Sequence, residues 1–138
     1  MKSAIRYYSK FGHSAQMAQV IGEVMGVKPE SVIKPLPQDE EFDVLFIGAG
    51  VFLGKVNGNI KEFARTLNPQ KVKQVVCFGS SAIVSSPVPQ LRAIFEELGF
   101  NVADASFSCR GSMGPLHSGH PNDVDLQLLR EFVINFSK

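Results

Sequence analysis

The segment from Ser9 to Ser14 has the residue types of a phosphate-binding loop. It combines two hydroxyl side chains with Gly12 between a short apolar strand and the start of a helix. Backbone N–H groups at a helix start lack intrahelical partners, and the helix dipole adds partial positive charge, so an anion is stabilised there. A plain strand-to-helix turn with a capping serine needs the same residue types. On this segment alone, the two interpretations are equally supported.

The segment from Gly48 to Lys55 is rich in glycine but completes no known nucleotide motif. A Walker A loop needs glycine at Ala49 and a hydroxyl residue at Val56, and a dinucleotide fingerprint needs glycine at Leu53. The apolar residues 51–53 instead suit a flat aromatic ligand. The alternative is that Phe52 packs onto a neighbouring helix.

A third segment, from Gly79 to Pro87, consists of small residues and serines with few larger side chains. Small residues let a ligand approach the backbone amides closely, so the edge of a polar heterocycle could be bound there. A simple connecting loop is the alternative interpretation.

Cysteine and histidine residues occur together only near the C-terminal end of the sequence. Cys109, His117, His120 and Asp123 match no compact zinc signature, and the two histidines are better explained as loop residues. Cys109 is the last residue of an expected strand and is the candidate reactive thiol, whereas Cys77 lies in an apolar strand and is expected in the core. No Ser-His-Asp arrangement or Gly-x-Ser-x-Gly motif is evident, so we predict neither a catalytic residue nor a metal site.

The elements that must position these segments alternate between strands and helices. Apolar periodicity and Gly or Pro breaks predict five strands, over 3–8, 31–33, 42–47, 72–78 and 101–109. Four helices are predicted between or after them, and Asn122 or Asp123 is expected to cap the last one. Their apolar faces are Met17, Ala18, Ile21, Val24 and Met25; Ile60, Phe63, Ala64 and Leu67; Leu91, Ile94, Phe95 and Leu98; and Leu128, Leu129, Phe132, Val133 and Phe136.

This alternation predicts an α/β protein, a three-layer α/β/α sandwich that forms a single domain over 1–138. The short strand 31–33 and the alternating strand 101–109 suit the sheet edges, while the continuous apolar strands suit the centre. Right-handed crossovers then give a five-stranded parallel sheet of order 2-1-3-4-5. In this arrangement, loops 9–14, 49–57 and 79–87 share the edge at the carboxyl ends of the strands, where ligands bind.

Composition excludes several classes of function. The chain has 14 Lys and Arg residues against 13 Asp and Glu, a net charge of +1, so no nucleic-acid partner is expected. No apolar run reaches the roughly 20 residues of a membrane span, and no signal peptide is evident. Two cysteines form no disulfide framework, so we expect a cytoplasmic location.

These segments together resemble the short-chain flavodoxins along essentially the whole chain. The phosphate motif Ser/Thr-x-Thr-Gly-x-Thr corresponds to residues 9–14, with Phe11 in place of one hydroxyl residue. The aromatic residue Phe11 before Gly12-His13 resembles the FMN-binding quinone reductases of this fold, which carry an aromatic residue before a Gly-His pair. The segment 43–55 resembles the second flavin loop of short flavodoxins and of flavodoxin-like protoporphyrinogen oxidases. Unlike the usual flavodoxin, this chain is not acidic and lacks a tyrosine in the third loop.

The resemblance implies non-covalently bound FMN and an electron-transfer role, with flavin cycling between oxidised, semiquinone and hydroquinone states. The alternatives are an FMN-dependent oxidoreductase, and a flavin-free binding module on the same fold. The implied partner is a redox protein or a small redox substrate, and the oligomeric state is left open. Gly54 is the candidate for a backbone carbonyl that accepts a hydrogen bond from reduced flavin. The implied cofactor-binding residues are Ser9, Lys10, Phe11, Gly12, His13, Ser14, Val51, Phe52, Leu53, Gly54, Lys55, Gly79, Ser80, Ser81 and Ala82.

Overall fold

The computed structural model describes residues 1–138 except residue 53 and the segments 82–85 and 112–118. Strands and helices alternate along most of the described chain, as predicted, but β2, β3 and β4 follow one another without a helix between them. The elements are β1 (Ser3–Tyr8), α1 (His13–Met25), β2 (Glu30–Ser31), β3 (Val44–Phe52), β4 (Lys55–Val56), α2 (Gly58–Arg65), the short 3₁₀ helix η1 (Pro69–Lys71), β5 (Val75–Ser81), α3 (Val88–Glu97), β6 (Val102–Arg110) and α4 (Asp123–Ser137).

The sheet has the predicted arrangement of its parallel strands. Its order is β2-β1-β3-β5-β6, which is 2-1-3-4-5 when the parallel strands are counted in sequence. The sixth strand, β4, was not predicted; it pairs antiparallel with β3 and forms a hairpin at the end of that strand. The register aligns Tyr8 with Ala49, Gly50 with Ser80, and Ser80 with Cys109. The carboxyl ends of four parallel strands therefore meet along one edge.

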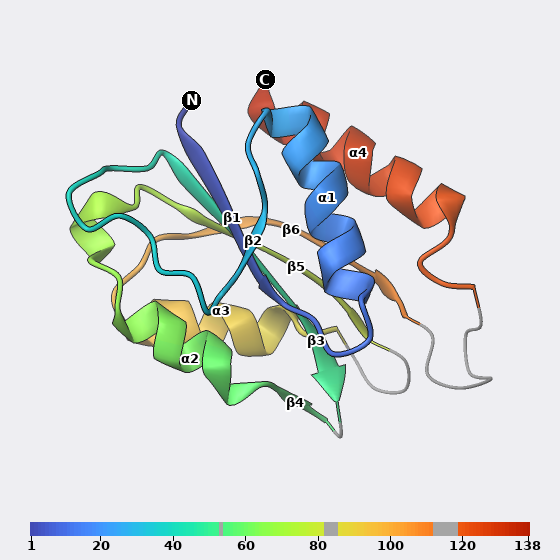
Figure 1. Cartoon of the computed structure of the whole chain (residues 1–138), viewed down its shortest axis with the longest axis horizontal. Helices are drawn as coiled ribbons and strands as arrows, with labels where there is room; N and C mark the ends of the chain where they lie inside the picture. Colours follow the sequence, from blue (N-terminus) through green and yellow to red (C-terminus); the bar gives the residue numbers. More distant parts are fainter. Residues whose placement is uncertain (53, 82–85, 112–118) are drawn as a thin grey trace.

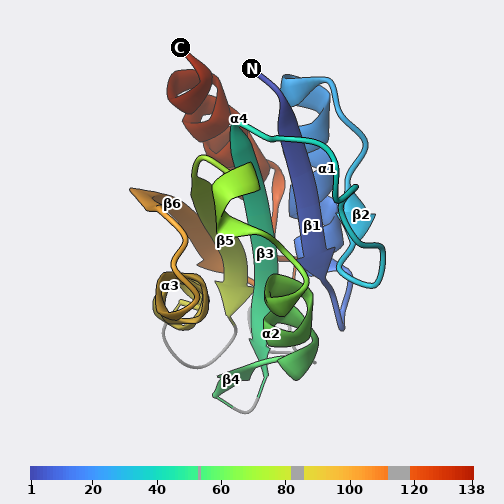
Figure 2. The same ribbon diagram turned by 90° about the vertical axis from the view of Figure 1, so that its left-hand side faces the viewer.

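Helices cover both faces of the sheet (Figures 1 and 2). Helices α1 and α4 pack on one face, where a buried cluster includes Met17, Phe46 and Leu129. Helices α2 and α3 lie on the other face, over a cluster that includes Ile60 and Phe95. The three-layer prediction is confirmed. The prediction that Leu128 belongs to the buried face of α4 is wrong, because Leu128 is 51% exposed while Leu129 is fully buried.

Two central strands extend further toward the carboxyl edge than the sequence predicts. The glycine-rich residues 48–50 were predicted to form a loop but belong to β3, and residues 79–81 belong to β5. Gly48 is required there by packing, because a Cβ atom at this position would overlap the buried Phe78 ring. Glycine commonly marks a loop, but inside a strand it also permits a close approach of neighbouring groups. Strand β5 also begins at Val75 rather than at residue 72, and β2 occupies 30–31 rather than 31–33.

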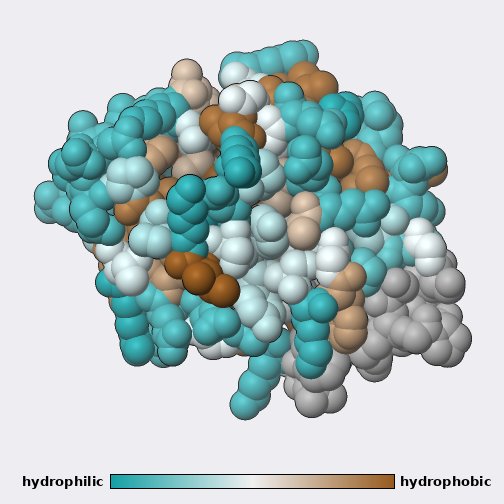
Figure 3. Space-filling model, in the orientation of Figure 1, coloured by the Kyte–Doolittle hydropathy of each residue, from teal (hydrophilic) through white to brown (hydrophobic). Residues whose placement is uncertain are grey.

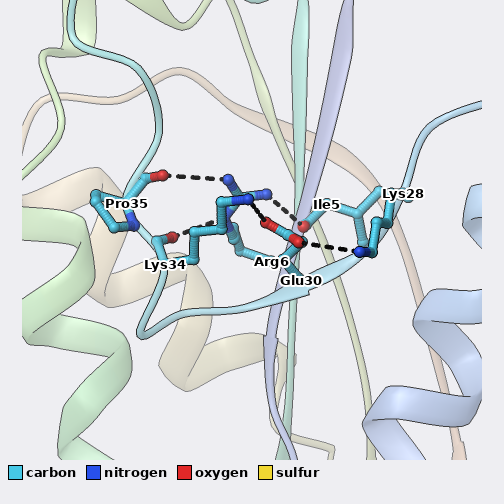
Figure 4. A network of polar contacts seen from close by, with 6 residues as sticks. All are labelled: Ile5, Arg6, Lys28, Glu30, Lys34 and Pro35. Atoms are coloured by element: carbon cyan, nitrogen blue, oxygen red, sulfur yellow. Dashed lines mark hydrogen bonds and ion pairs between the residues drawn. The ribbon is translucent and has the colours of Figure 1, made fainter.

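A buried arginine fixes the edge of the sheet formed by β1 and β2 (Figure 4). The Arg6 guanidinium donates hydrogen bonds to the carbonyl oxygens of Lys34 at 2.8 Å, Ile5 at 3.0 Å and Pro35 at 3.2 Å. Burial lowers the pKa of Arg6, and the carboxylate of Glu30 opposes that shift. Glu30 is itself held at 2.7 Å by Lys34, and the hydrogen bond from this lysine lowers the pKa of Glu30. These contacts fasten residues 30–35 to β1, so Arg6 has a structural role.

The exposed surface gives two further observations. Within the described segments, no helix is both long enough and apolar enough to cross a membrane. Figure 3 shows hydrophilic side chains over most of one face, with apolar side chains in small separate groups. On this face, therefore, no broad apolar patch is exposed in the described part of the surface.

Candidate functional site

A cleft of about 200 Å³ lies at the carboxyl ends of β1, β3 and β5. This is the edge at which the fold class predicts ligand binding. The segment 9–14, the β3–β4 hairpin and the end of β5 each contribute to its walls. The described lining residues are Tyr8, Ser9, Lys10, Phe11, His13, Ser14, Gly50, Val51, Lys55, Val56, Asn57, Ser80, Ser81 and Gly111.

The Ser9–Ser14 segment contains an unsatisfied polar group. The Oγ atom of Ser9 is buried and has no hydrogen-bond partner, although Ser9 lines the cleft. A buried hydroxyl without a partner costs about 1–3 kcal/mol. Ser3 is the other described residue with such an atom, and it is the first residue of β1, at the end of the strand away from the cleft. A hydrogen-bonding ligand in the cleft would remove this cost at Ser9.

The start of α1 also differs from the other helix starts. Gly12 is the N-cap residue, in the left-handed conformation with φ of 87°, and it makes no side-chain cap hydrogen bond. In contrast, Asn57 caps α2 and Asn122 caps α4 through side-chain oxygens, and Ser86 Oγ accepts from the Val88 N–H at the start of α3. Of the two caps predicted for the last helix, Asn122 and Asp123, the structure confirms Asn122, with a capping box. Gly12 has no side-chain acceptor, so this N-cap residue cannot cap the first turn of α1 as Asn57 and Asn122 cap α2 and α4.

The β3–β4 hairpin forms a second wall of the cleft. Val51 and Lys55 line it, as predicted, whereas Leu53 and the side chain of Phe52 lie outside the described part of the structure. Gly54 adopts a φ of 79° and is not among the described lining residues. Its carbonyl oxygen accepts a hydrogen bond from Gln90 of α3 at 2.9 Å. In its predicted role toward flavin, this carbonyl would either accept a second hydrogen bond or exchange the one from Gln90.

The end of β5 forms the third wall. Ser80 and Ser81 line the cleft, and Ala82 lies outside the described residues. Gly79 was predicted to contact cofactor, but the structure places it in the packing between β5 and α3. A Cβ atom at Gly79 would overlap the Ala49 carbonyl oxygen and lie 2.5 Å from Pro87. Gly79 therefore allows β3, β5 and α3 to approach one another.

Gly111 brings the end of β6 into the site, which the sequence did not reveal. Its N–H donates to the Ser81 carbonyl at 3.2 Å. A Cβ atom at Gly111 would lie 2.8 Å from the His13 ring and 3.0 Å from Ser80 Oγ. A larger residue would displace these two lining side chains. Four other lining residues were absent from the predicted cofactor-binding set, namely Tyr8, Gly50, Val56 and Asn57. Tyr8 directly precedes the segment 9–14, and the other three lie within the predicted loop 49–57.

The described walls of the cleft carry positive charge without negative charge. Lys10 and Lys55 are among the lining residues, and no aspartate or glutamate is. Phe11 is 51% exposed, and Lys10 Nζ lies 5.8 Å from the centre of its ring. This distribution favours an anionic ligand group in the cleft.

The Cys and His candidates do not assemble into a site among the described residues. No group of three or more His, Cys, Asp or Glu side chains capable of holding a metal is present in that part of the chain, and His117 lies outside it. The His120 Nδ1 and Asp125 Oδ2 atoms are 2.6 Å apart at the start of α4. Burial, followed by the charge of Asp125, raises the pKa of the Cys109 thiol to about 12. Since the thiolate is the nucleophile, the prediction of a reactive thiol at Cys109 is not supported.

Comparison with known proteins agrees with this architecture. No protein-family model matches the chain. A curated protein of Methanocaldococcus jannaschii, described as "Uncharacterized protein MJ0298", is 24% identical over 150 residues, covering 100% of this chain and 99% of that protein. A solved structure described as a flavodoxin from the domain Archaea has a TM-score of 0.80 and 23% identity, covering 99% of this chain and 96% of the other.

Two further solved structures extend the comparison. Oxidised flavodoxin 2 from Bacillus cereus has a TM-score of 0.69 at 18% identity, with 99% of this chain and 98% of the other covered. Rubredoxin oxygen:oxidoreductase from Desulfovibrio gigas has a TM-score of 0.75 at 16% identity, but the match spans only 34% of that longer chain. The class of protein defined by this sheet order and these neighbours is the flavodoxin-like α/β/α fold, so the predicted resemblance is confirmed at the level of the fold.

Proposed function

We propose that this protein binds FMN non-covalently in the cleft and acts as an electron carrier. The observation that carries the proposal is the buried, unpartnered Oγ of Ser9 in the segment that opens α1. A phosphate group would accept hydrogen bonds from this hydroxyl and from backbone N–H groups at the start of α1, where the N-cap residue Gly12 makes no side-chain cap hydrogen bond. The likeness of the fold to flavodoxins supports the same ligand.

The residues of the cleft fit FMN in chemistry as well as in position. The segment 9–14 and Lys10 suit its phosphate, while Val51 and the backbone around Gly50 and Ser80 suit its ring. The volume of about 200 Å³ is below the roughly 300–1,000 Å³ typical of a small-molecule pocket. The described residues would therefore cover the ligand only in part.

When bound, FMN supplies one-electron and two-electron redox chemistry, and the protein supplies binding, orientation and electrostatics. This division of roles requires no catalytic nucleophile from the chain. It is consistent with Cys109, whose raised pKa of about 12 keeps the thiol protonated at neutral pH. The carrier role therefore needs from the cleft only residues that bind and orient FMN.

The partner in this proposal is a redox protein or a small redox substrate that reaches the carboxyl edge of the sheet. Among the described residues of 8–16, 49–59, 79–89 and 109–122, which border this edge, the charged side chains are Lys10, Lys55 and Arg110, and none is an aspartate or glutamate. The roughly two negative charges of a bound phosphate group would offset most of this positive charge. Docking would then depend on shape and apolar contact more than on the long-range attraction that guides acidic flavodoxins to basic partners.

The direct test is the visible absorption spectrum of the purified protein, recorded before FMN addition and again after FMN addition and desalting. We expect a flavin spectrum that survives desalting. Stepwise photoreduction should then accumulate the one-electron-reduced state, whereas direct two-electron reduction by NAD(P)H would favour the oxidoreductase alternative. A protein that remains colourless after FMN addition would contradict the binding proposal and favour the flavin-free module.

Replacing Ser9 by alanine should have opposite effects on binding and on stability. Ser9→Ala removes a proposed phosphate hydrogen bond, so FMN affinity should fall by about tenfold. The same change removes an unsatisfied buried hydroxyl, so the free energy of unfolding of the apoprotein should rise by up to about 1 kcal/mol. Flavin titration and urea unfolding measure the two effects. Ser86→Ala is the control, because its Oγ is bonded to Val88 N, and it should lower stability without this gain.

A further inference from the structure

The Gln90 side chain connects α3 to the β3–β4 hairpin, which forms one wall of the cleft. Its Nε2 donates to the Gly54 carbonyl at 2.9 Å, and its Oε1 accepts from the Val56 N–H at 2.9 Å. A carboxamide presents a donor and an acceptor together, so one side chain holds both the turn residue Gly54 and the β4 residue Val56. The two hydrogen bonds span 36 and 34 residues of sequence.

The hairpin depends on this connection because it has little pairing of its own. Strand β4 has two residues, and its register with β3 consists of Val51 opposite Val56 and Phe52 opposite Lys55. A short two-stranded hairpin is at best marginally stable in water without further packing. The contact from α3 therefore fixes where Val56 and Lys55 stand at the edge of the cleft.

Gln90 itself is not among the described residues that line the cleft. Gln90 would therefore affect ligand binding through the hairpin, because it sets the position of Val56 and the direction of the Gly54 carbonyl. That carbonyl already accepts one hydrogen bond from α3.

We infer that Gln90 is a positioning residue of the cleft, which holds the β3–β4 hairpin in the conformation that binds the flavin ring. This inference rests on the proposed function. It assigns ring binding to the α3-tethered hairpin and leaves phosphate binding to the segment 9–14. The two parts of the ligand should then respond separately to substitutions in the two parts of the site.

The experiment compares Gln90→Met with wild-type protein in three measurements. Methionine keeps the length of the side chain and removes both hydrogen bonds. In the apoprotein, hydrogen exchange at the Val56 amide should accelerate by about tenfold. The dissociation constants for FMN and for riboflavin, which lacks the phosphate, should both rise by about three- to tenfold, and their ratio should stay unchanged.

Two further variants make the result specific. Gln90→Glu keeps the acceptor for Val56 N–H, so exchange at Val56 should return to the wild-type rate, while loss of the donor to Gly54 should leave ring binding weakened. Gln127→Met changes an exposed glutamine of α4 in the same way and should leave all three measurements unchanged. Unfolding midpoints show whether global stability accounts for any difference.

The possible failures are distinguishable. If the Val56 amide exchanges at the same rate in Gln90→Met and wild type, the tether does not hold the hairpin and the inference is overturned. If exchange accelerates while both flavin affinities stay unchanged, Gln90 is purely structural and the inference is again overturned. If wild-type protein binds neither FMN nor riboflavin, the proposed function fails and this inference fails with it.

Discussion

Gly12→Asp is expected to weaken FMN binding by about 100-fold while changing riboflavin binding by less than about threefold. The substitution adds a negative charge at the N-cap of α1, beside the proposed phosphate site. Two like charges about 5 Å apart near a protein surface repel by roughly 3 kcal/mol, which corresponds to about two powers of ten in affinity. Riboflavin carries no phosphate, so it should be insensitive to this charge.

Gly12→Asn separates charge from backbone effects. Gly12 has a φ of 87°, which strains any L residue, but asparagine and aspartate tolerate this region better than most. A Cβ atom at Gly12 meets no other atom within 4 Å, so neither side chain is excluded sterically. Asparagine should therefore lower FMN affinity by only a few-fold. Equal losses of affinity in the two variants, or a similar loss for riboflavin, would refute phosphate binding at this helix start.

The sequence predicted those parts of the fold that depend on local pattern. The alternation of apolar strands and amphipathic helices is a local property, and so is the Asn122 cap of α4. The edge positions of β2 and β6 followed from the short strand and from the alternating strand. In each case the residues that determine the structure are neighbours in the sequence, so periodicity and capping preferences are sufficient.

The features that were missed depend on contacts between distant residues. Gly48 looked like a loop residue, and only the position of the Phe78 ring explains its place in β3. Gly111 lies in the site because β6 pairs with β5, and Gln90 contacts the hairpin from α3. Glycine and glutamine do not indicate such partners by residue type. The candidate site was therefore predicted as three segments at one edge of the sheet, without Gly111 and Gln90, which contact those segments from the end of β6 and from α3.

Gly79→Ala is expected to be the most destabilising of the substitutions discussed, by about 3 kcal/mol or more. The added methyl group would overlap the carbonyl oxygen of Ala49, with which Gly79 is paired in register, and would lie 2.5 Å from Pro87. Neither neighbour is a flexible side chain that can turn away, so β5 must move from β3 or from α3. Urea unfolding should show a lower midpoint at an unchanged slope.

Gly58→Ala provides the matched control for this prediction. Gly58 begins α2, and a Cβ atom there meets nothing within 4 Å, so the free energy of unfolding should rise slightly or stay within about 1 kcal/mol of wild type.

Because Gly79 holds together the strand ends that carry Gly50 and Ser80, Gly79→Ala should weaken the binding of FMN and of riboflavin by similar factors. Loss of FMN affinity alone would instead place Gly79 in the phosphate site. Unfolding free energies within 0.5 kcal/mol of wild type for both variants, a margin typical of neutral surface changes, would show that the strand ends adjust to the methyl group.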